Sequence, residues 1–334
     1  MSETKDIYRK VQEFMKNFYP GEPSGNLARN LNTLAVMITG ILVGKETQLP
    51  KIALNVPEPI AAPSTEKRIK RLLINESVTE ETFFFPFIRT LLLKLDLEEL
   101  VVAVDGSVAG RGCICLMASL IYKNRALPLA FTVFKGKKGH LPEQAHIELV
   151  EKLKSVISYE PKNVIVLGDG EFDGVELQRT LAGWGWKYVC RTARNTILGV
   201  GDEDFSMDFL ASMLPEGHFN KLKNCTVTKK KYGPVTAIAW WAQDCDEPIF
   251  LVTNFVSASM ACEYYAKRFT IETFFSDQKS RGFAVDKSHL SEPMRLARLL
   301  FGACLAYVWT IFFGASGRGA PLYEAYTPEG PLRS

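Results

Sequence analysis

Apolar side chains recur every three or four positions through the first 95 residues, which is the spacing of one face of an α-helix. A proline-bearing connector, LPKIALNVPEPIAAP, divides this stretch. After it, Ser64 and Thr65 stand before Glu66, an order that indicates a helix start. The pattern therefore predicts a separate helical N-terminal region over residues 1–95.

From residue 98 the pattern changes to short apolar and β-branched runs, which predict strands. Three come first and fit an antiparallel meander, in EELVVAVDGS, CICLMASLIY and LPLAFTVFKG. Helices and strands then alternate, in PEQAHIELVEKLKSVIS, NVIVLGDG, VELQRTLAGWG and KYVCRT. A meander followed by such alternation predicts an α/β fold with a sheet of mixed direction over residues 96–194.

Residues 195–258 interrupt this alternation and predict a β-strand insertion. NCTVTKKKYGPVTAIAWWA fits a hairpin that turns at Tyr232-Gly233-Pro234, and PIFLVTNF fits one further strand. Residues 259–316 return to helical spacing and complete the core. Residues 317–334 are rich in Gly and Pro and predict a loosely held C-terminal tail.

One apolar segment could be a membrane span or a buried helix, because Leu299–Ala315 carries no charge over 17 residues. That length only reaches the lower limit for a membrane span, about 17 residues. The segment contains two glycines and follows the amphipathic run EPMRLARLL. We therefore expect a buried core helix and no membrane.

Composition describes an ordinary globular protein, with 47% hydrophobic and 23% charged residues and a net charge of only +3. Charge matters locally, where three clusters each fit a solvated face or a DNA contact. They are Lys67, Arg68, Lys70 and Arg71; Lys135, Lys137 and Lys138; and Lys229, Lys230 and Lys231. In the first cluster, a helix carrying Arg68 and Arg71 would be amphipathic and could cross a DNA backbone.

Seven cysteines, an odd number without a CxxC pair at zinc spacing, indicate a reduced protein. The first residues, MSETKDIYRKVQEF, lack the apolar stretch of a secretion signal. We expect a cytoplasmic protein.

Two aspartates follow apolar runs at predicted strand ends: Asp105 after VVAV and Asp169 after VIVLG. Open sheets collect functional groups at the carboxyl ends of their strands. Each aspartate also fits an ordinary Asp-Gly turn, before Gly106 or Gly170. Neither position alone decides between a site and a turn.

A third carboxylate changes that balance. In YYAKRFTIETFFSDQK, Tyr265, Arg268, Glu272 and Lys279 follow one another at offsets of 3, 4 and 7, which predicts one polar helical face. Three carboxylates brought together repel, at roughly 4 kcal/mol for each pair about 4 Å apart at an effective dielectric near 20. Divalent cations such as Mg²⁺ or Mn²⁺ offset this repulsion, and two of them support phosphodiester chemistry. We therefore expect a metal site of Asp105, Asp169 and Glu272.

The four polar residues match Tyr-x2-Arg-x3-Glu-x6-Lys, and the chain thereby resembles the insertion sequence 4 family of bacterial DDE transposases. The resemblance covers about residues 98–313, including VDGS, GDGEFDG and IETFFSDQKSRG. It implies a ribonuclease-H-like core with a β insertion before the last catalytic helix. It also implies a transposase that cuts the ends of its element with two divalent ions and joins the 3′ ends to target DNA, commonly through hairpin intermediates.

The resemblance further implies residues that contact double-stranded DNA. Tyr265, Arg268 and Lys279 would contact phosphates near the cleaved end, and Trp240 or Trp241 would stack on a flipped base. Independently of the resemblance, Arg191 and Arg194 follow a predicted strand, where they could follow a DNA backbone or form surface ion pairs. Holding two element ends together would need a homodimer on DNA, associated with the bacterial nucleoid.

Other interpretations remain open. AVDGSVAGRG and LGDGEFDG also resemble the phosphate loops of ATP-dependent phosphotransferases of the actin and sugar-kinase type, although this leaves the four-residue stripe unexplained. A non-catalytic DNA-binding protein derived from a transposase is a second alternative. His140, His146 and Glu143 match no common metal-ligand spacing, and we expect the histidines to be structural or solvent-facing. Glu171 and Asp173 could assist a metal or favour the start of the next helix.

Overall fold

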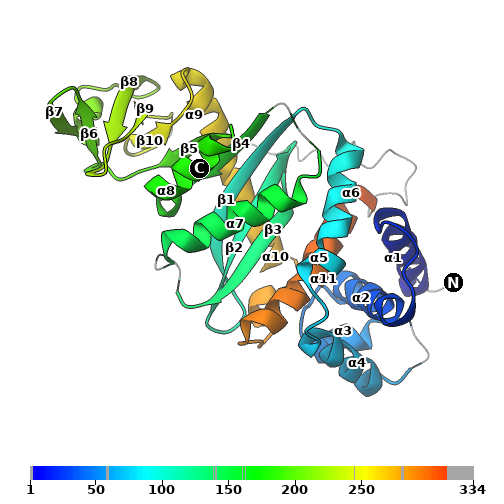
Figure 1. Ribbon diagram of the computed structural model, residues 1–334. Coiled ribbons are helices and arrows are strands. Elements are labelled where there is room, and N and C mark those ends of the chain that lie inside the picture. The colour runs from blue at the N-terminus through cyan, green and yellow to red at the C-terminus, as the bar shows by residue number, and fades with distance from the viewer. Residues whose placement is uncertain are drawn as a thin grey trace.

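The computed structural model describes residues 3–313 except 58, 59, 138, 140, 160, 162, 244, 280 and 281. The predicted tail, together with Lys138 and His140, lies outside the described residues. Figure 1 shows three parts in sequence: helices at the N-terminus, a central sheet, and smaller strands that extend this sheet at the far end from the helices.

Helices make up the N-terminal part, as predicted. They are α1 (Glu3–Phe18), α2 (Gly25–Gly44), α3 (Leu49–Leu54), α4 (Ala62–Ile74), α5 (Glu80–Phe83) and α6 (Phe85–Leu95). The helix expected from Ser64 starts two residues earlier, at Ala62, with Pro63 in its first turn. Proline is well tolerated there because the first amides of a helix have no partner within it.

The core sheet has the predicted meander, β1 (Glu99–Ala109), β2 (Cys113–Tyr122) and β3 (Arg125–Lys135), followed by β4 (Asn163–Gly168) and β5 (Lys187–Arg191). Strands β1 to β3 are antiparallel, whereas β4 is parallel to β1 and to β5. Helices α7 (Glu143–Val156) and α8 (Val175–Gly183) connect them. This order, β3-β2-β1-β4-β5, confirms the predicted ribonuclease-H-like fold of mixed α/β class.

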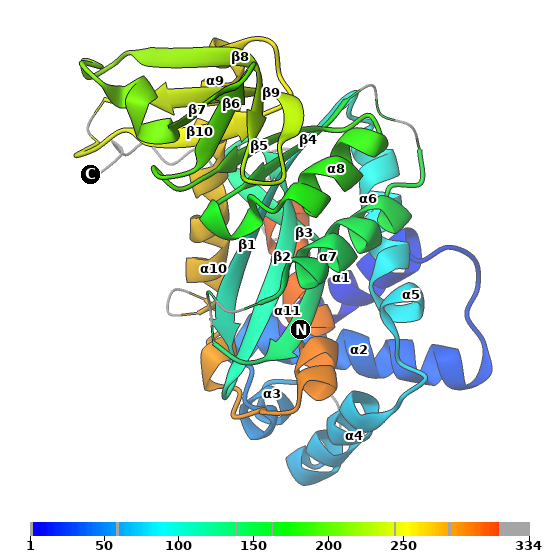
Figure 2. The same cartoon turned by 60° about the vertical axis from the view of Figure 1, so that its left-hand side comes forward.

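The insertion continues the core sheet. It contains β6 (Ile197–Val200), β7 (Glu203–Ser206), the 3-10 helix η2 (Met207–Ala211), β8 (Phe219–Val227), β9 (Tyr232–Trp240) and β10 (Ile249–Thr253). Strand β10 pairs with β9 on one side and with β5 on the other, so one sheet of ten strands spans both parts. Figure 2 shows this extension from the side.

The hairpin turn predicted at Tyr232-Gly233-Pro234 is wrong, because these residues begin β9 and the chain reverses at residues 228–231. The register between β8 and β9 is irregular here, between Cys225 and Val227. A Cβ on Gly233 would lie 2.6 Å from the Cys225 carbonyl oxygen. Gly-Pro thus marks a bulge within the hairpin, where both residues are tolerated.

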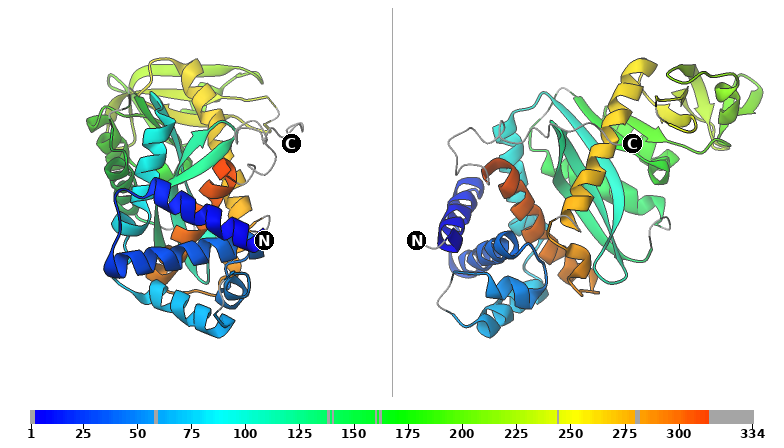
Figure 3. Two further views of the ribbon diagram at one scale, coloured as in Figure 1. Left: turned by 90° about the vertical axis from the view of Figure 1, so that its right-hand side faces the viewer. Right: turned by 180° about the vertical axis from the view of Figure 1, so that it is seen from behind.

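The closing helices and turns are α9 (Ala258–Ala266), the 3-10 turn η3 (Lys267–Phe269), α10 (Thr270–Gln278), the 3-10 turn η4 (Val285–Lys287) and α11 (Pro293–Phe313). Among the closing helices, α9 and α10 lie across the face of the sheet opposite α7 and α8, whereas α11 lies beside the edge strand β3 and the N-terminal helices (Figure 3). The continuous helix expected for Tyr265, Arg268, Glu272 and Lys279 is wrong in detail. Turn η3 interrupts the helix at Arg268, and Lys279 lies just beyond the end of α10.

Helix α11 joins the N-terminal helices to the sheet. Arg298 is 5% exposed and donates hydrogen bonds to the carbonyls of Leu73 (2.9 Å) and Val78 (3.0 Å). Helices α2 and α11 are both long and apolar enough to cross a membrane, but over half of the first and 78% of the second are buried. Core helices pass the same test, so this evidence for a membrane span is weak. The buried helix expected from Leu299 is confirmed through Trp309.

Candidate active site

Two aspartates lie side by side where the parallel pairing of β1 and β4 ends. Val104 and Gly168 are register partners, so Asp105 and Asp169 each follow one of this pair. Strand β1 continues past Asp105, paired only with β2 up to Ala109. The prediction that Asp105 ends its strand is therefore wrong. Asp105 instead marks the point at which one neighbouring strand stops, which opens the sheet beside its carboxylate.

The Asp169 carboxylate is held by the turn that follows it. Its Oδ1 accepts a hydrogen bond from the Glu171 amide (3.0 Å) at the start of the 3-10 turn η1 (Gly170–Phe172). Phe172 is fully buried, and its ring lies 4.3 Å from that of His146. A Cβ on Gly168 would lie 2.5 Å from the Phe172 Cβ, so only glycine fits before the aspartate.

His146 lies buried beneath this turn, as expected for a structural histidine. Burial lowers its pKa, and the nearby Asp169 and Glu143 carboxylates oppose that shift. The imidazole is therefore shifted toward its neutral form. Its ring packs against Phe172 and so supports the turn that holds Asp169.

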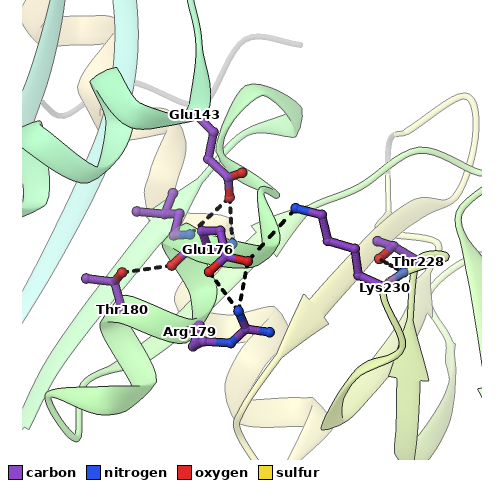
Figure 4. Close-up of polar contacts among 7 residues, drawn as sticks. Glu143, Glu176, Arg179, Thr180, Thr228 and Lys230 are labelled. Carbon is purple, nitrogen blue, oxygen red and sulfur yellow. Dashed lines mark hydrogen bonds and ion pairs between the residues drawn. The ribbon is translucent and has the colours of Figure 1, made fainter.

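Glu143 anchors the next helix, as Figure 4 shows. Its Oε1 accepts hydrogen bonds from the amides of Glu176 (2.7 Å) and Leu177 (3.0 Å), in the first turn of α8. A carboxylate there satisfies amides that have no partner within the helix and complements its dipole. Asp173 accepts instead from the Thr192 hydroxyl (2.6 Å), and burial raises the Asp173 pKa.

The third carboxylate, Glu272, faces Asp105 across a surface depression of about 440 Å³. This depression is lined by Asp105, Gly106, Ser107, Val108, Glu272, Phe275, Ser276 and Lys279. The Asp105 side chain is 6% exposed and that of Glu272 58%. One acid therefore lies at the floor and the other at the open side, with Lys279 at the same depression.

Arg268 connects the two acids. Its Nη1 lies 3.6 Å from Oδ2 of Asp105, and its Nη2 lies 3.5 Å from Oε1 of Glu272. The guanidinium is also 4.6 Å from the ring centre of Phe269 and 5.6 Å from that of Tyr265. A buried positive charge thus sits between two of the three predicted metal ligands.

Tyr265 differs most from its predicted role. It is 1% exposed and packs in an apolar cluster between α9 and the sheet. Burial raises the pKa of its hydroxyl, and the charges of Arg268 and Arg191 oppose the shift. In this structure the hydroxyl is not accessible to a DNA phosphate, because the packing of α9 covers it.

The donor chemistry fits a divalent ion, but the arrangement is not yet compact. All three predicted ligands are carboxylates, the oxygen ligands that Mg²⁺ and Mn²⁺ prefer. Within the part of the chain that the structure describes, no three His, Cys, Asp or Glu side chains are grouped closely enough to hold an ion. To form such a group, Glu272 would have to move toward Asp105. The Arg268 guanidinium lies between these two carboxylates.

The predicted DNA-contacting residues lie in several places. Trp240 packs against the α9 side of the sheet, whereas Trp241 packs against the other side and donates to the Cys245 carbonyl (2.8 Å). Neither ring is fully exposed. Arg191 is exposed at the end of β5, and Arg194 forms the surface ion pair that was the alternative, with Asp208.

The three lysines 229–231 occupy the exposed turn between β8 and β9. Lys230 reaches back from the insertion to Glu176 on α8, 3.9 Å away (Figure 4), and Lys231 pairs with Asp204. Arg68 and Arg71 line a depression between α2 and α4. These basic residues therefore do not form one cluster with the carboxylates.

Sequence reasoning missed three features of this region. The four-residue spacing of Arg268 and Glu272 was visible and is typical of a helical ion pair, but nothing indicated that Arg268 would also reach Asp105. Arg29, which lies on α2, lines the same depression as Arg68 and Arg71. Glu143 was considered only as a possible metal ligand, whereas its side chain caps α8. No local sequence signal connects it to a helix 33 residues away.

Comparison with known families agrees with this fold. The family model described as the transposase DDE domain matches residues 98–309, from just before β1 into α11. No curated protein matches the chain. Membership implies DNA binding and a transposase activity that depends on divalent metal ions. Because the match covers more than half of the chain, the protein belongs to the transposase DDE domain family.

Proposed function

We propose that this transposase binds the ends of a mobile element, cleaves them with two Mg²⁺ or Mn²⁺ ions, and joins the freed 3′ ends to target DNA. Asp105, Asp169 and Glu272 are the proposed metal ligands. The observation that carries the proposal is the register of β1 and β4, which sets Asp169 next to Asp105, together with the depression that Asp105 and Glu272 both line. Membership of the insertion sequence 4 family is part of this proposal and rests on the four-residue signature.

The chemistry divides between the ions and the protein. Bound divalent ions would activate the attacking oxygen and stabilise the leaving oxygen of a phosphodiester. Asp105, nearly buried and fixed by a hydrogen bond from the Gly106 amide (2.6 Å), has little freedom to move. Glu272 is exposed and can adjust its position. Lys279, at the same depression, is placed to attract a phosphate.

The wider DNA surface is proposed to include several exposed basic groups. Arg191 ends β5 and Arg194 follows it, next to the strand that precedes Asp169, and residues 229–231 form the turn that reaches back to α8. Arg68 and Arg71 would contact DNA through the N-terminal helices. For the two tryptophans, base stacking requires a ring to leave its present packing. The proposed role of Tyr265 is to position Arg268, whose guanidinium lies against its ring.

The test uses DNA that carries the flanks of the protein's own genomic copy. Purified protein is incubated with this DNA and Mg²⁺ or Mn²⁺, and the products are separated on a denaturing gel. Cuts at both flanks are expected for the wild type and not for Asp169→Asn. Asp246→Asn is the matched control, because Asp246 is exposed and lies outside the acidic depression.

The same preparation separates the alternatives. A wild type that binds the flanks without cutting them in either metal would favour a non-catalytic DNA-binding descendant. Stabilisation by ATP, with no response to DNA, would favour a phosphotransferase. The acidic lining of the depression argues against a phosphotransferase, because carboxylates would repel the phosphates of ATP. Glu171 adds a further carboxylate near Gly106, in the first Asp-Gly segment.

Assembly is a separate part of the proposal. Two element ends must be held together before they are joined, so we expect a homodimer on paired end DNA. Sedimentation of the protein with two end fragments measures this directly. Monomers on paired ends would contradict the dimer but not the chemistry.

A further inference from the structure

The position of Arg268 is unusual for a residue whose predicted partner is DNA. Its side chain is 7% exposed, and both of its ionic contacts are to proposed metal ligands. These contacts, at 3.6 and 3.5 Å, are longer than the 2.7–2.9 Å of strong charge-assisted hydrogen bonds. A guanidinium cannot lose its proton in a protein, so the charge stays in place.

Electrostatics explains why a cation is needed there when no metal is bound. The nearly buried Asp105 carboxylate lies beside Asp169, and a buried charge without a counter-charge strongly destabilises a fold. Arg268 supplies that counter-charge. A divalent ion bound between Asp105 and Glu272 would supply it as well, and would be repelled by the guanidinium. Arg268 and a metal ion therefore compete for the same carboxylates.

The surroundings of Arg268 offer it another position. Its guanidinium already lies against the rings of Phe269 and Tyr265, and Phe269 is 48% exposed. A guanidinium that turned away from Glu272 would still have these rings as cation–π partners. A DNA phosphate at the depression would favour that turn, because arginine binds phosphate through two parallel hydrogen bonds.

We infer that Arg268 is an exchangeable counter-ion that couples metal binding to DNA binding. Without DNA it neutralises Asp105 and Glu272 and weakens their affinity for divalent ions. A DNA phosphate draws it away and thereby strengthens metal binding. Linkage requires the reverse as well, so bound metal strengthens DNA binding. This inference rests on the proposed function of the three carboxylates.

The experiment measures Mn²⁺ binding rather than activity, through the electron paramagnetic resonance signal of free Mn²⁺. Wild type, Arg268→Met and Arg268→Gln are titrated without DNA and with a duplex of the genomic flank. Glutamine can still donate a hydrogen bond to Asp105, which protects the fold if methionine does not. Arg179→Met is the control, since Arg179 is an exposed arginine that pairs with Glu176 on α8.

Without DNA, both Arg268 variants are expected to bind Mn²⁺ about tenfold more tightly than the wild type, a typical size for coupling between sites. DNA phosphates can ligate the ion themselves, so the decisive quantity is the gain in affinity on adding DNA. That gain is expected to be smaller in the variants than in the wild type. Arg179→Met should match the wild type in both measurements.

Either of two binding results would overturn the inference. One is Mn²⁺ binding in the variants that is no tighter than in the wild type; the other is an equal gain with DNA. Variants that fold neither with nor without Mn²⁺ would also overturn it, because Arg268 would then be purely structural. The proposed function fails separately, if wild-type Mn²⁺ binding is absent or is unchanged by Asp105→Asn and Asp169→Asn.

Discussion

Asp105 and Asp169 directly follow Val104 and Gly168, which are paired across the parallel strands β1 and β4. The parallel register ends at this pair, while β1 continues alongside β2 for four more residues beyond Asp105. Asp105 is thus fixed within a strand, and Asp169 is fixed directly after the neighbouring strand, where its carboxylate accepts a hydrogen bond from the Glu171 amide. The third carboxylate, Glu272, comes from a helix and depends on side-chain contacts for its position.

Replacing either strand carboxylate should abolish cleavage. For Asp105→Asn and Asp169→Asn, we expect the rate to fall by at least about 100-fold, since even groups that only support metal ligands contribute 10- to 100-fold. DNA binding should persist, because the basic residues are unchanged. Cleavage of flank DNA on a gel, together with a binding titration, measures both. Near-normal cleavage by either variant would refute its role as a ligand.

Removing the Glu143 side chain should destabilise the protein. Glu143→Ala removes the acceptor for two amides of α8, and loss of such a helix cap costs about 1 kcal/mol. Urea unfolding measures the change in free energy. Glu148→Ala is the control, because Glu148 lies on α7 like Glu143 but is exposed. Its removal should change stability by less than about 0.5 kcal/mol. Equal effects would rule out the capping role.

Gly168 and Gly170 flank Asp169 and should respond differently to alanine. A Cβ at Gly168 would lie 2.5 Å from the Phe172 Cβ, whereas a Cβ at Gly170 meets no atom within 4 Å. Gly168→Ala should therefore lower stability by about 1–3 kcal/mol, as overpacking does, and displace Asp169. Gly170→Ala should have little effect on unfolding. Similar unfolding curves for the two variants would disprove this packing argument.

Stability should fall in mild acid because of His146. Burial lowers its folded-state pKa below the ordinary 6.5, so the unfolded chain binds more protons as the pH falls below that value. The contribution is complete above about pH 6.5 and is lost below it, by at most about 1.4 kcal/mol per pH unit.

The test compares unfolding free energies at several pH values below and above 6.5. His146→Gln should show a smaller loss in acid than the wild type. His218→Gln, a change at an exposed histidine of the insertion, should retain the wild-type dependence. An unchanged slope in His146→Gln would assign the acid sensitivity to other groups.

Lys230 should influence DNA binding more than folding. It is 59% exposed, and its 3.9 Å contact with Glu176 is weak. If the turn of residues 229–231 follows a DNA backbone, Lys230→Ala should weaken binding and reduce the salt dependence of the affinity by about one released counterion. Lys154→Ala on α7 removes the same charge elsewhere. Identical salt slopes for the two variants would exclude the turn from the DNA surface.

Much of the core was predictable because its elements are long and strongly patterned. The meander, the strand before Asp169 and the strand ending at Arg191 all form buried runs. The hairpin of β6 and β7 was missed because each strand has only four residues and half of EDFS is charged. The turn at Gly233 was misplaced because Gly-Pro marks bulges as well as turns.

The candidate site was predictable in composition but not in detail. The spacing from Tyr265 to Lys279 gave the residue types, yet not the 3-10 turn at Arg268 or the burial of Tyr265. The burial of Tyr265 follows from the packing of α9 against strands far away in the sequence. The contact between Arg268 and Asp105 joins residues more than 160 positions apart, and no local pattern encodes it.

Helix α11 also sets an order of events during synthesis. The carbonyls of Leu73 and Val78 receive their hydrogen bonds from Arg298, and Gly302 packs closely against Met37 of α2. These partners leave the ribosome more than 200 residues after the helices that need them. Until then the apolar faces of α2 and α4 are incompletely covered and exposed to chaperones and proteases. A polypeptide that ends before residue 293 would therefore lack the partners with which its N-terminal helices complete their packing.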